Sequence, residues 1–330
     1  MIKVFETFAG YGGWSFALKQ LSVENKVVGY SEVDKYAIQC YEQNHNGKNY
    51  GDITKINPHD LPDFDLYVSS PPCQAFSIAG KGQGKDDDKN RGRLFEDAIE
   101  IMRVKQPKYA VYENVKGLTF KTHKDYFDYI IRLMKDAGYV VYWKVLNTKE
   151  HGIPQNRERV FIVCIRLDVV DDSFKFPEKQ ELKLFLKDIV ERDVPKKYFL
   201  SDKKLKTFTK EIFPEGDESD IVSVAIRNKN RSKHQSLGLP YGTFPKQLHL
   251  QFNRDIGVSF AVKSATHEYM VANIKLENIR HLTPKECFRL QGFFKDEINL
   301  DGLSEQAKYK LAGNGVSINV CAKLLRNLLK

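Results

Sequence analysis

Short apolar runs alternate with amphipathic stretches over residues 3–137, and this alternation restricts the fold more than any other feature of the sequence. Apolar runs of this length are typical of buried strands, whereas apolar residues three or four apart indicate helices. The strand candidates are residues 3–8, 27–31, 66–69 and 109–112. The helix candidates are residues 13–21, 35–44, 94–105 and 124–137. Because strands that alternate with helices form parallel sheets, we predict an α/β fold with a doubly wound, mostly parallel sheet.

The second half of the chain has a different character. Two apolar runs, residues 139–146 and 159–167, have no helical stretch between them, so we expect an antiparallel pair at the edge of the sheet. From about residue 186 to residue 303 the periodicity is weak, with short β-like pieces such as residues 221–227 and 258–262, which predicts a smaller, irregular domain.

Helical spacing returns in residues 304–330. One face of this stretch carries the apolar residues Val316, Val320, Leu324 and Leu328. We expect this face to dock on the sheet. The predicted domains are residues 1–185 plus 308–330, and residues 186–307.

The composition is that of a folded protein, because 42% of the residues are hydrophobic and 29% are charged. No run approaches the roughly 18 apolar residues that a bilayer span needs. Glu6 also stands where a signal peptide would be apolar, so we expect a cytoplasmic protein without a membrane partner. The net charge of +9 favours a polyanionic partner, with nucleic acid as the leading class.

The five cysteines are widely spaced and include no Cys-x-x-Cys pair, which argues against a disulfide framework and a structural zinc site. Cys73 differs from the others because Pro71 and Pro72 precede it at the end of a predicted strand. The prolines fix φ and hold the thiol at the carboxyl edge of the sheet, which indicates a nucleophile. We expect the remaining cysteines to be small buried apolar side chains: Cys40, Cys164, Cys287 and Cys321.

A glycine-rich turn with Gly10, Gly12 and Gly13 follows the first predicted strand and opens a helix. Such a turn lets a ligand approach the backbone and the helix N–H groups. Ser15 and Ala17 stand near the place of the third glycine of a dinucleotide fingerprint. Another adenosine ligand is therefore favoured over a nicotinamide cofactor. The alternative is an ordinary strand-to-helix turn.

Acidic residues end the neighbouring predicted strands. Glu32 follows the glycines by about 20 residues, where an acid accepts hydrogen bonds from ribose hydroxyls. Asp52 ends a candidate third strand, and we expect it to meet an adenine amino group. Glu113 ends the strand that begins at residue 109. Because the carboxyl ends of parallel strands share one edge, these acids should face one cleft with Gly10 and Cys73. A solvated surface carboxylate is the alternative for each acid taken alone.

Arg157 and Arg159 stand at the start of the predicted edge strand, which continues as the apolar run to residue 167. Residues two apart on an extended segment point the same way, so both guanidinium groups are expected in one site. The alternative is a solvated basic edge that prevents sheet aggregation.

These motifs, in this order, resemble those of the DNA (cytosine-5) methyltransferases of bacterial or phage restriction–modification systems. The resemblance covers most of the chain. The matching segments are residues 8–13, 72–74, 113–115, 155–159, 280–292 and 313–316.

The resemblance implies a methyltransferase that uses S-adenosyl-L-methionine and acts on a flipped-out cytosine in a specific double-stranded DNA sequence. The larger predicted domain would be catalytic and the smaller one a target-recognition domain. Cys73 would add covalently to the ring, Glu113 would meet N3, Arg159 would hold O2 and Arg157 would support the nucleophile or the ring. No metal is implied. Carried over by position, the donor site would be lined by Phe8, Gly10, Tyr11, Gly13, Glu32, Val33, Asp52, Ile53, Pro72, Leu94, Asn314 and Val316.

Two departures from the family pattern concern recognition. Val33 stands where some members have a tryptophan that stacks on adenine, so Phe8 would carry most of that stacking. The Thr-Leu pair common in the family's recognition domains has no clear counterpart, and Ala261-Val262 is the nearest match by context.

DNA reading is expected in the smaller domain, because residues 221–270 carry seven Lys and Arg against two Asp and Glu. Lysines mainly neutralise phosphates, while Arg and Asn read base edges. The candidate DNA-binding residues are Arg227, Asn228, Asn230, Arg231 and Lys233. Residues 80–93 resemble the family's segment that closes over DNA. For any single charged residue here, a solvated surface position is the alternative.

Three rival functions stay open on the sequence. An RNA (tRNA) cytosine-5 methyltransferase would share the catalytic motifs, although the sizeable basic domain favours DNA. A binding module on an inactive scaffold is disfavoured by the intact Cys73, Glu113 and arginines. An NAD-dependent dehydrogenase is disfavoured by the missing glycine. We expect a monomer that has a cognate restriction endonuclease as a partner acting on the same site.

Overall fold

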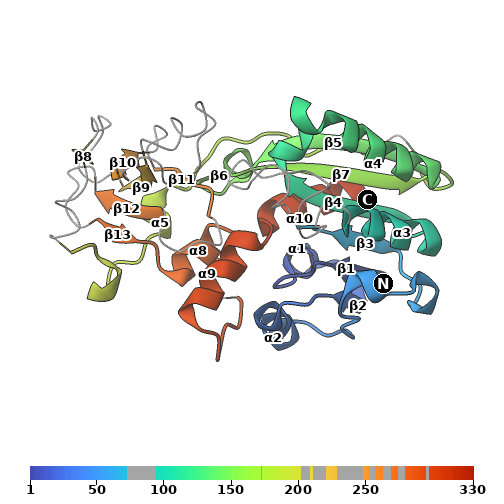
Figure 1. The fold of residues 1–330 in the computed structure, drawn as a ribbon, viewed down its shortest axis with the longest axis horizontal. Coiled ribbons are helices and arrows are strands. Elements are labelled where there is room, and N and C mark those ends of the chain that lie inside the picture. Colours follow the sequence, from blue (N-terminus) through green and yellow to red (C-terminus); the bar gives the residue numbers. More distant parts are fainter. Residues whose placement is uncertain are drawn as a thin grey trace, which may run out of the picture.

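The structure is a computed structural model of the chain. It describes residues 1–72, 94–171, 173–201, 209–210, 221–228, 248–252, 257–262, 269–273, 279–294 and 297–330. Within these ranges the strands form a larger six-stranded sheet and a smaller five-stranded sheet, which lie at opposite ends of the long axis (Figure 1).

The larger sheet has the strand order β2-β1-β3-β4-β7-β5. Its strands are β1 Ile2–Thr7, β2 Asn25–Ser31, β3 Leu66–Ser69, β4 Tyr109–Val115, β5 Tyr139–Asn147 and β7 Glu158–Arg166. The first four strands are parallel, whereas β7 pairs antiparallel with both β4 and β5. This arrangement confirms the predicted mostly parallel α/β fold and the antiparallel pair at its edge.

Helices cover both faces of this sheet (Figure 1). They are α1 Gly13–Gln20, α2 Lys35–Asn44, α3 Leu94–Lys105, α4 Lys124–Asp136 and α10 Ile318–Leu328. Successive strand residues point to opposite faces, so Phe5 packs with α3 and α4 while its neighbour Val4 packs with α1 and α10. Val320, Leu324 and Leu328 of α10 lie in the second of these cores, which confirms that the C-terminal helix docks on the sheet.

The smaller sheet has the order β13-β12-β9-β10-β8. Its strands are β8 Thr209–Lys210, β9 Ile221–Asn228, β10 Leu248–Phe252, β12 Tyr269–Asn273 and β13 Arg280–His281. Strand β9 confirms the β-like piece expected at residues 221–227. The five-stranded sheet was not predicted, because its other strands are short and their pairing depends on distant segments. Two-residue strands β6 Gln155–Asn156 and β11 Ser259–Phe260 pair in parallel and link the two parts of the chain.

Short helices fill the junction between the sheets. They are α5 Leu186–Ile189, α8 Pro284–Arg289 and α9 Glu305–Asn314, together with the 3-10 turns η1 Ile53–Lys55, η2 Pro58–Asp60, η4 Lys116–Thr119, η5 Lys121–His123, η6 Thr148–His151 and η7 Lys196–Tyr198. The predicted domain boundary after residue 307 falls inside α9, which packs against both α8 and α2. The two-domain division itself stays a prediction.

The four cysteines expected in the interior, Cys40, Cys164, Cys287 and Cys321, are all buried and unpaired by disulfides. Cys73 lies outside the described residues. In the described part of the chain, no helix combines the length and the apolar character that a bilayer crossing requires.

The docking of α10 makes a stability prediction. Leu324 is fully buried, so Leu324→Ala should lower the free energy of unfolding by about 2–5 kcal/mol through lost transfer energy and a residual cavity. Leu167→Ala is the control, because Leu167 is 61% exposed and should change the value by about 0.5 kcal/mol or less. Urea unfolding measures both values, and equal effects of the two substitutions would show that α10 is not part of the core.

Candidate active site

The glycine-rich turn leaves β1 at its carboxyl end and adopts a left-handed backbone. Phe8, Gly10 and Gly12 have φ values of 53°, 58° and 79°. A Cβ added to Gly10 would meet nothing within 4 Å, so this glycine is needed for its backbone angle and not for lack of space. Gly12 is the N-cap of α1. The turn therefore presents open backbone at the edge of the sheet, where a ligand can approach it.

Glu32 directly follows β2 and binds this turn. Its carboxylate accepts hydrogen bonds from Gly10 N at 2.9 Å, Val33 N at 2.8 Å and Asp34 N at 2.9 Å. The carboxylate thus fixes the backbone of the glycine turn, a role that strand-end position alone did not reveal. Its predicted contact with ribose stays a prediction.

Asn49 is a residue that sequence reasoning missed. Its Oδ1 accepts from Glu32 N at 3.2 Å and from Gly51 N at 2.9 Å, and its Nδ2 donates to Glu32 O at 3.1 Å. These bonds join the segment that follows β2 to the segment that precedes Asp52. No local pattern distinguishes Asn49 from the other asparagines nearby, because two of its three hydrogen bonds go to Glu32, 17 residues away.

Asp52 is not at the end of a strand, contrary to the prediction. Around it only one isolated bridge forms, between Tyr30 and Asn49. Asp52 is the N-cap of η1 and accepts from Thr54 N at 3.1 Å and Thr54 Oγ1 at 2.9 Å. Capping a helix start competes with strand pairing at this point. Asp52 still lies beside the end of β2, because Ser31 Oγ donates to the carbonyl oxygen of the preceding residue, Gly51, at 2.7 Å.

The remaining predicted donor-site residues fall into two groups. Tyr11 and Val316 are buried, and the Tyr11 hydroxyl donates to Val316 O, so the Tyr11 ring points into the protein and not into an open site. Gly13 lies against Val316, whose Cγ2 would be 2.5 Å from an added Cβ.

Val33, by contrast, is 69% exposed beside Glu32, and Asn314 is exposed at the end of α9. The other predicted donor-site residues are half-buried or buried at their strand and helix ends: Phe8, Ile53, Pro72 and Leu94.

The segment that leads to Cys73 lies beside β4. Asn114 Nδ2 donates to Pro71 O at 3.3 Å, and Trp14 Nε1 donates to Ser70 Oγ at 3.3 Å. These bonds hold the chain next to the end of β4 up to Pro72, the last residue described before Cys73. Glu113 precedes Asn114. The segment that leads to Cys73 and the strand that carries Glu113 therefore end at neighbouring points of the sheet.

Glu113 forms a buried ion pair with Arg159. Glu113 Oε1 and Arg159 Nε are 3.0 Å apart, and Glu113 is 7% exposed. Burial raises the pKa of Glu113, while the positive charges of Arg159 and Arg157 oppose that shift. The antiparallel register places Val115 opposite Arg159, which brings the arginine to the acid. A carboxyl group whose pKa is raised by burial is better suited than an exposed one to share a proton with a ligand.

Contrary to the sequence prediction, the Arg157 guanidinium does not lie beside that of Arg159 at the Glu113 carboxylate. Arg157 is 2% exposed, and its guanidinium donates to the carbonyl oxygens of Val262, Gly313 and Gly315. The expected alternation fails because Arg157 N donates to Gln155 O at 3.0 Å in a tight turn between β6 and β7. Arg157 and Arg159 therefore do not lie on one continuous strand. The charge of Arg157 still acts on Glu113, but its guanidinium donates to backbone carbonyls, whereas that of Arg159 pairs with the carboxylate.

The DNA-reading candidates are largely outside the described residues. Asn230, Arg231 and Lys233 are among those, as are residues 80–93 of the predicted closing segment. Arg227 and Asn228 are the last two residues of β9, where they pair with His249 and Leu248 of β10.

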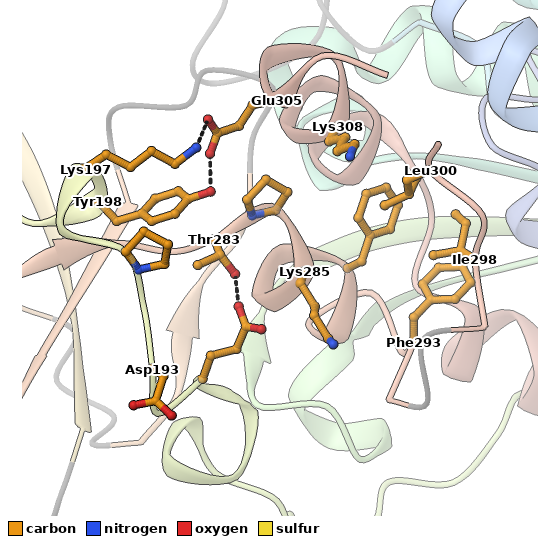
Figure 2. Close-up of a pocket in the computed structure, with 14 residues that line it drawn as sticks. Asp193, Lys197, Tyr198, Thr283, Lys285, Phe293, Ile298, Leu300, Glu305 and Lys308 are labelled. Atoms are coloured by element: carbon orange, nitrogen blue, oxygen red, sulfur yellow. Dashed lines mark hydrogen bonds and ion pairs between the residues drawn. The ribbon is translucent and has the colours of Figure 1, made fainter. Parts of the chain in front are cut away.

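A cavity of about 530 Å³ lies away from these strand ends, between residues 191–198 and helices α8 and α9 (Figure 2). Its walls include Phe293, Ile298 and Leu300, and Glu305 binds Lys197 and Tyr198 at its rim. None of the predicted catalytic or donor-site residues lines it. The cavity follows from the packing of the junction and was not visible in the sequence.

The ion pair makes a titration prediction. Arg159→Met removes the positive charge nearest Glu113 but keeps an unbranched stem, so the pKa of Glu113 should rise further. Lys116→Met is the control, because Lys116 pairs with Glu158 at an exposed position where solvent screens the charge. Carbon-13 NMR of labelled glutamate carboxyls measures the shift, with Glu113→Gln assigning the signal. An unchanged pKa in Arg159→Met would contradict the ion pair.

Comparisons with known proteins agree with this geometry. Type II methyltransferase M.NgoBI of Neisseria gonorrhoeae is 38% identical over 328 residues, which cover 97% of this chain and 90% of the relative. Type II methyltransferase M.HhaI of Haemophilus parahaemolyticus is 34% identical over 327 residues, with 99% and 94% covered. The crystal structure of S. pombe Dnmt2 methyltransferase has a TM-score of 0.66 at 19% identity and covers 100% of this chain and 98% of that one.

The sequence similarity and the shared fold thus extend over nearly the whole chain. Residues 2–330 match the sequence model of the C-5 cytosine-specific DNA methylase family. The chain belongs to the C-5 cytosine-specific DNA methylase family.

Proposed function

We propose that the chain transfers a methyl group from S-adenosylmethionine to carbon 5 of a cytosine in double-stranded DNA, through a covalent Cys73 adduct. The observation that carries the proposal is the buried Glu113–Arg159 pair at 3.0 Å, beside the segment that leads to Cys73. Family membership supports the reaction class, and the related type II methyltransferases support a restriction–modification context.

The edge of the sheet fits an adenosine-containing donor. The open backbone at Gly10, the exposed Val33 and the half-buried Phe8 offer a glycine cradle and two apolar side chains. Glu32 and Asp52 supply carboxylates on the same side. S-adenosylmethionine, when bound, supplies an electrophilic methyl group on a sulfonium, and the sulfur would keep the electron pair of the broken bond as the thioether S-adenosylhomocysteine.

Carbon 5 of cytosine is too electron-poor to accept that methyl group unaided. Addition of the Cys73 sulfur to carbon 6 turns the ring into an enamine whose carbon 5 is nucleophilic. Negative charge then develops on N3 and O2, so a protonated Glu113 at N3 and Arg159 at O2 stabilise the adduct. After methylation, loss of the carbon 5 proton to a base and expulsion of the Cys73 thiolate restore the aromatic ring.

The ring nitrogen of a base in a duplex is not accessible to Glu113, so the cytosine has to leave the stack. Extrusion costs a few kcal/mol, which contacts to the DNA backbone and grooves offset. Residues 221–270 are net basic and include strands β9 and β10 of the smaller sheet, which supports a role of that sheet in holding and reading DNA. A cognate endonuclease would recognise the same sequence, as the restriction–modification relatives suggest.

Trapping the adduct tests the proposal. Duplex DNA with 5-fluorocytosine at the target position should give a denaturation-resistant complex with the wild type, because fluorine blocks the final proton loss. Cys73→Ser should give none while it still binds DNA, since the hydroxyl is a far weaker nucleophile. Cys40→Ala is the matched control, because the Cys40 thiol is fully buried in α2 and cannot reach the DNA. A complex formed by Cys73→Ser would remove Cys73 from the mechanism.

The same experiment separates the DNA and RNA functions. Methyl transfer from labelled donor is measured on duplex DNA and on tRNA side by side. Transfer to DNA alone is expected, and transfer to tRNA alone would replace the proposed substrate with RNA.

Salt dependence tests the DNA contacts. If the basic segment neutralises six or more phosphates, raising the salt from 50 to 200 mM should weaken DNA association by about a thousandfold or more. Fluorescence anisotropy of labelled duplex measures the dissociation constant. Binding of the donor, which does not depend on these contacts, is the control. A flat response of DNA binding would contradict the assignment of the segment.

A further inference from the structure

The Arg157 guanidinium lies in the interior, where three segments of backbone meet. It donates to Val262 O at 2.9 Å and to Gly315 O at 2.7 Å, and both of its terminal nitrogens lie 3.3 Å from Gly313 O. These carbonyl groups are 105 to 158 residues away in the sequence. One side chain therefore joins the strand that carries Arg159, the segment after β11 and the turn between α9 and α10.

The end of α9 is a favourable place for a buried cation. The last carbonyl groups of a helix have no donor within the helix, and the helix dipole is negative there. Gly313 lies in the last turn of α9 and Gly315 is its C-cap. Arg157 supplies both the positive charge and the planar arrangement of donors that two such carbonyls require.

The same turn is held from the opposite side by Tyr11. The Tyr11 hydroxyl donates to Val316 O, and the Tyr11 ring lies so close to Gly315 that an added Cβ would be 1.9 Å from it. Residues 313–316 are thus fixed between the glycine turn after β1 and the segment before β7. Asn314, which is exposed, lies between these two points of attachment.

Gln155 strengthens the link to the smaller domain. Its Oε1 accepts from Val262 N at 3.1 Å, while the carbonyl of Val262 accepts from Arg157. Its Nε2 donates to Leu290 O at 2.5 Å. Both backbone polar groups of Val262 are therefore bound by the side chains of Gln155 and Arg157, which precede strand β7.

From this geometry we infer that Arg157 is a positioning residue: it sets the turn at residues 313–316, on the donor side, relative to the Glu113–Arg159 pair. The inference rests on the proposed function, because it assigns Asn314 and Val316 to the donor site. In this role Arg157 does not touch the cytosine ring. Its guanidinium positions the donor site through the turn at residues 313–316 and contacts the smaller domain through Val262.

Arg157→Lys tests the inference. Lysine keeps the charge but has a single ammonium group that cannot reach the carbonyls as a planar fork. We expect the dissociation constant for S-adenosylmethionine, measured by calorimetry, to rise about tenfold, as for loss of a hydrogen bond to a charged group. Amide hydrogen exchange in residues 313–317 should become faster. The pH profile of kcat should keep its shape, because Glu113 and Arg159 stay paired.

Arg166→Lys is the matched control. Arg166 lies on the same strand, at the opposite end from Arg159, and binds Asp168 and Gln106 O. The substitution removes a guanidinium fork of the same kind, so it should leave donor affinity and exchange at residues 313–317 unchanged. A rise in the donor dissociation constant equal to that of Arg157→Lys would reveal a general loss of packing and overturn the inference.

Tyr11→Phe provides a second, milder variant and a double-mutant cycle. If Tyr11 and Arg157 hold the same turn, the loss of donor affinity in Tyr11→Phe/Arg157→Lys should be smaller than the product of the two single losses. Multiplicative losses, or wild-type affinity in Arg157→Lys, would overturn the inference. Failure of the wild type to bind S-adenosylmethionine would instead overturn the proposed function.

Discussion

Parallel pairing of the first four strands is the constraint on which the candidate site depends. β1 pairs with β2 and β3, and β3 pairs with β4, all in the same direction. The strands therefore end at one edge of the sheet, and the residues that follow them meet there although they lie up to about a hundred positions apart in the sequence. The glycine turn, Glu32, Pro71 and Glu113 are neighbours for this reason, and each makes polar contacts that a surface loop would leave to water.

The antiparallel strand β7 adds what the parallel strands lack. It approaches β4 from the other direction and brings a cation to an acid whose pKa burial raises. A buried pair of this kind contributes little to stability once desolvation is counted, so the pair fits a chemical role better than a structural one. Two residues earlier the chain turns, and the Arg157 guanidinium donates to backbone carbonyls of Val262 and Gly315. The two arginines of one motif thus have different neighbours, a carboxylate for Arg159 and backbone carbonyls for Arg157.

Much of the fold could be predicted because it depends on local pattern. Helices α2 and α3 have the predicted bounds, residues 35–44 and 94–105, since their apolar spacing and, for α2, the Asp34 cap are written in consecutive residues. Asp52 was misplaced because a cap and a strand end look alike in sequence. Asn49 was missed because its value lies in bonds to backbone groups of another segment.

The sequence by itself determined the alternation of strands and helices, the burial of four cysteines and the set of motifs that identify the family. These follow from side-chain size, polarity and spacing, which act over a few residues. Only the tertiary structure decided which arginine meets Glu113, why Tyr11 points inward and how Gln155 and Arg157 bind the smaller domain. Those contacts depend on the register of distant strands and on unpaired carbonyls at a helix end, which no stretch of neighbouring residues specifies.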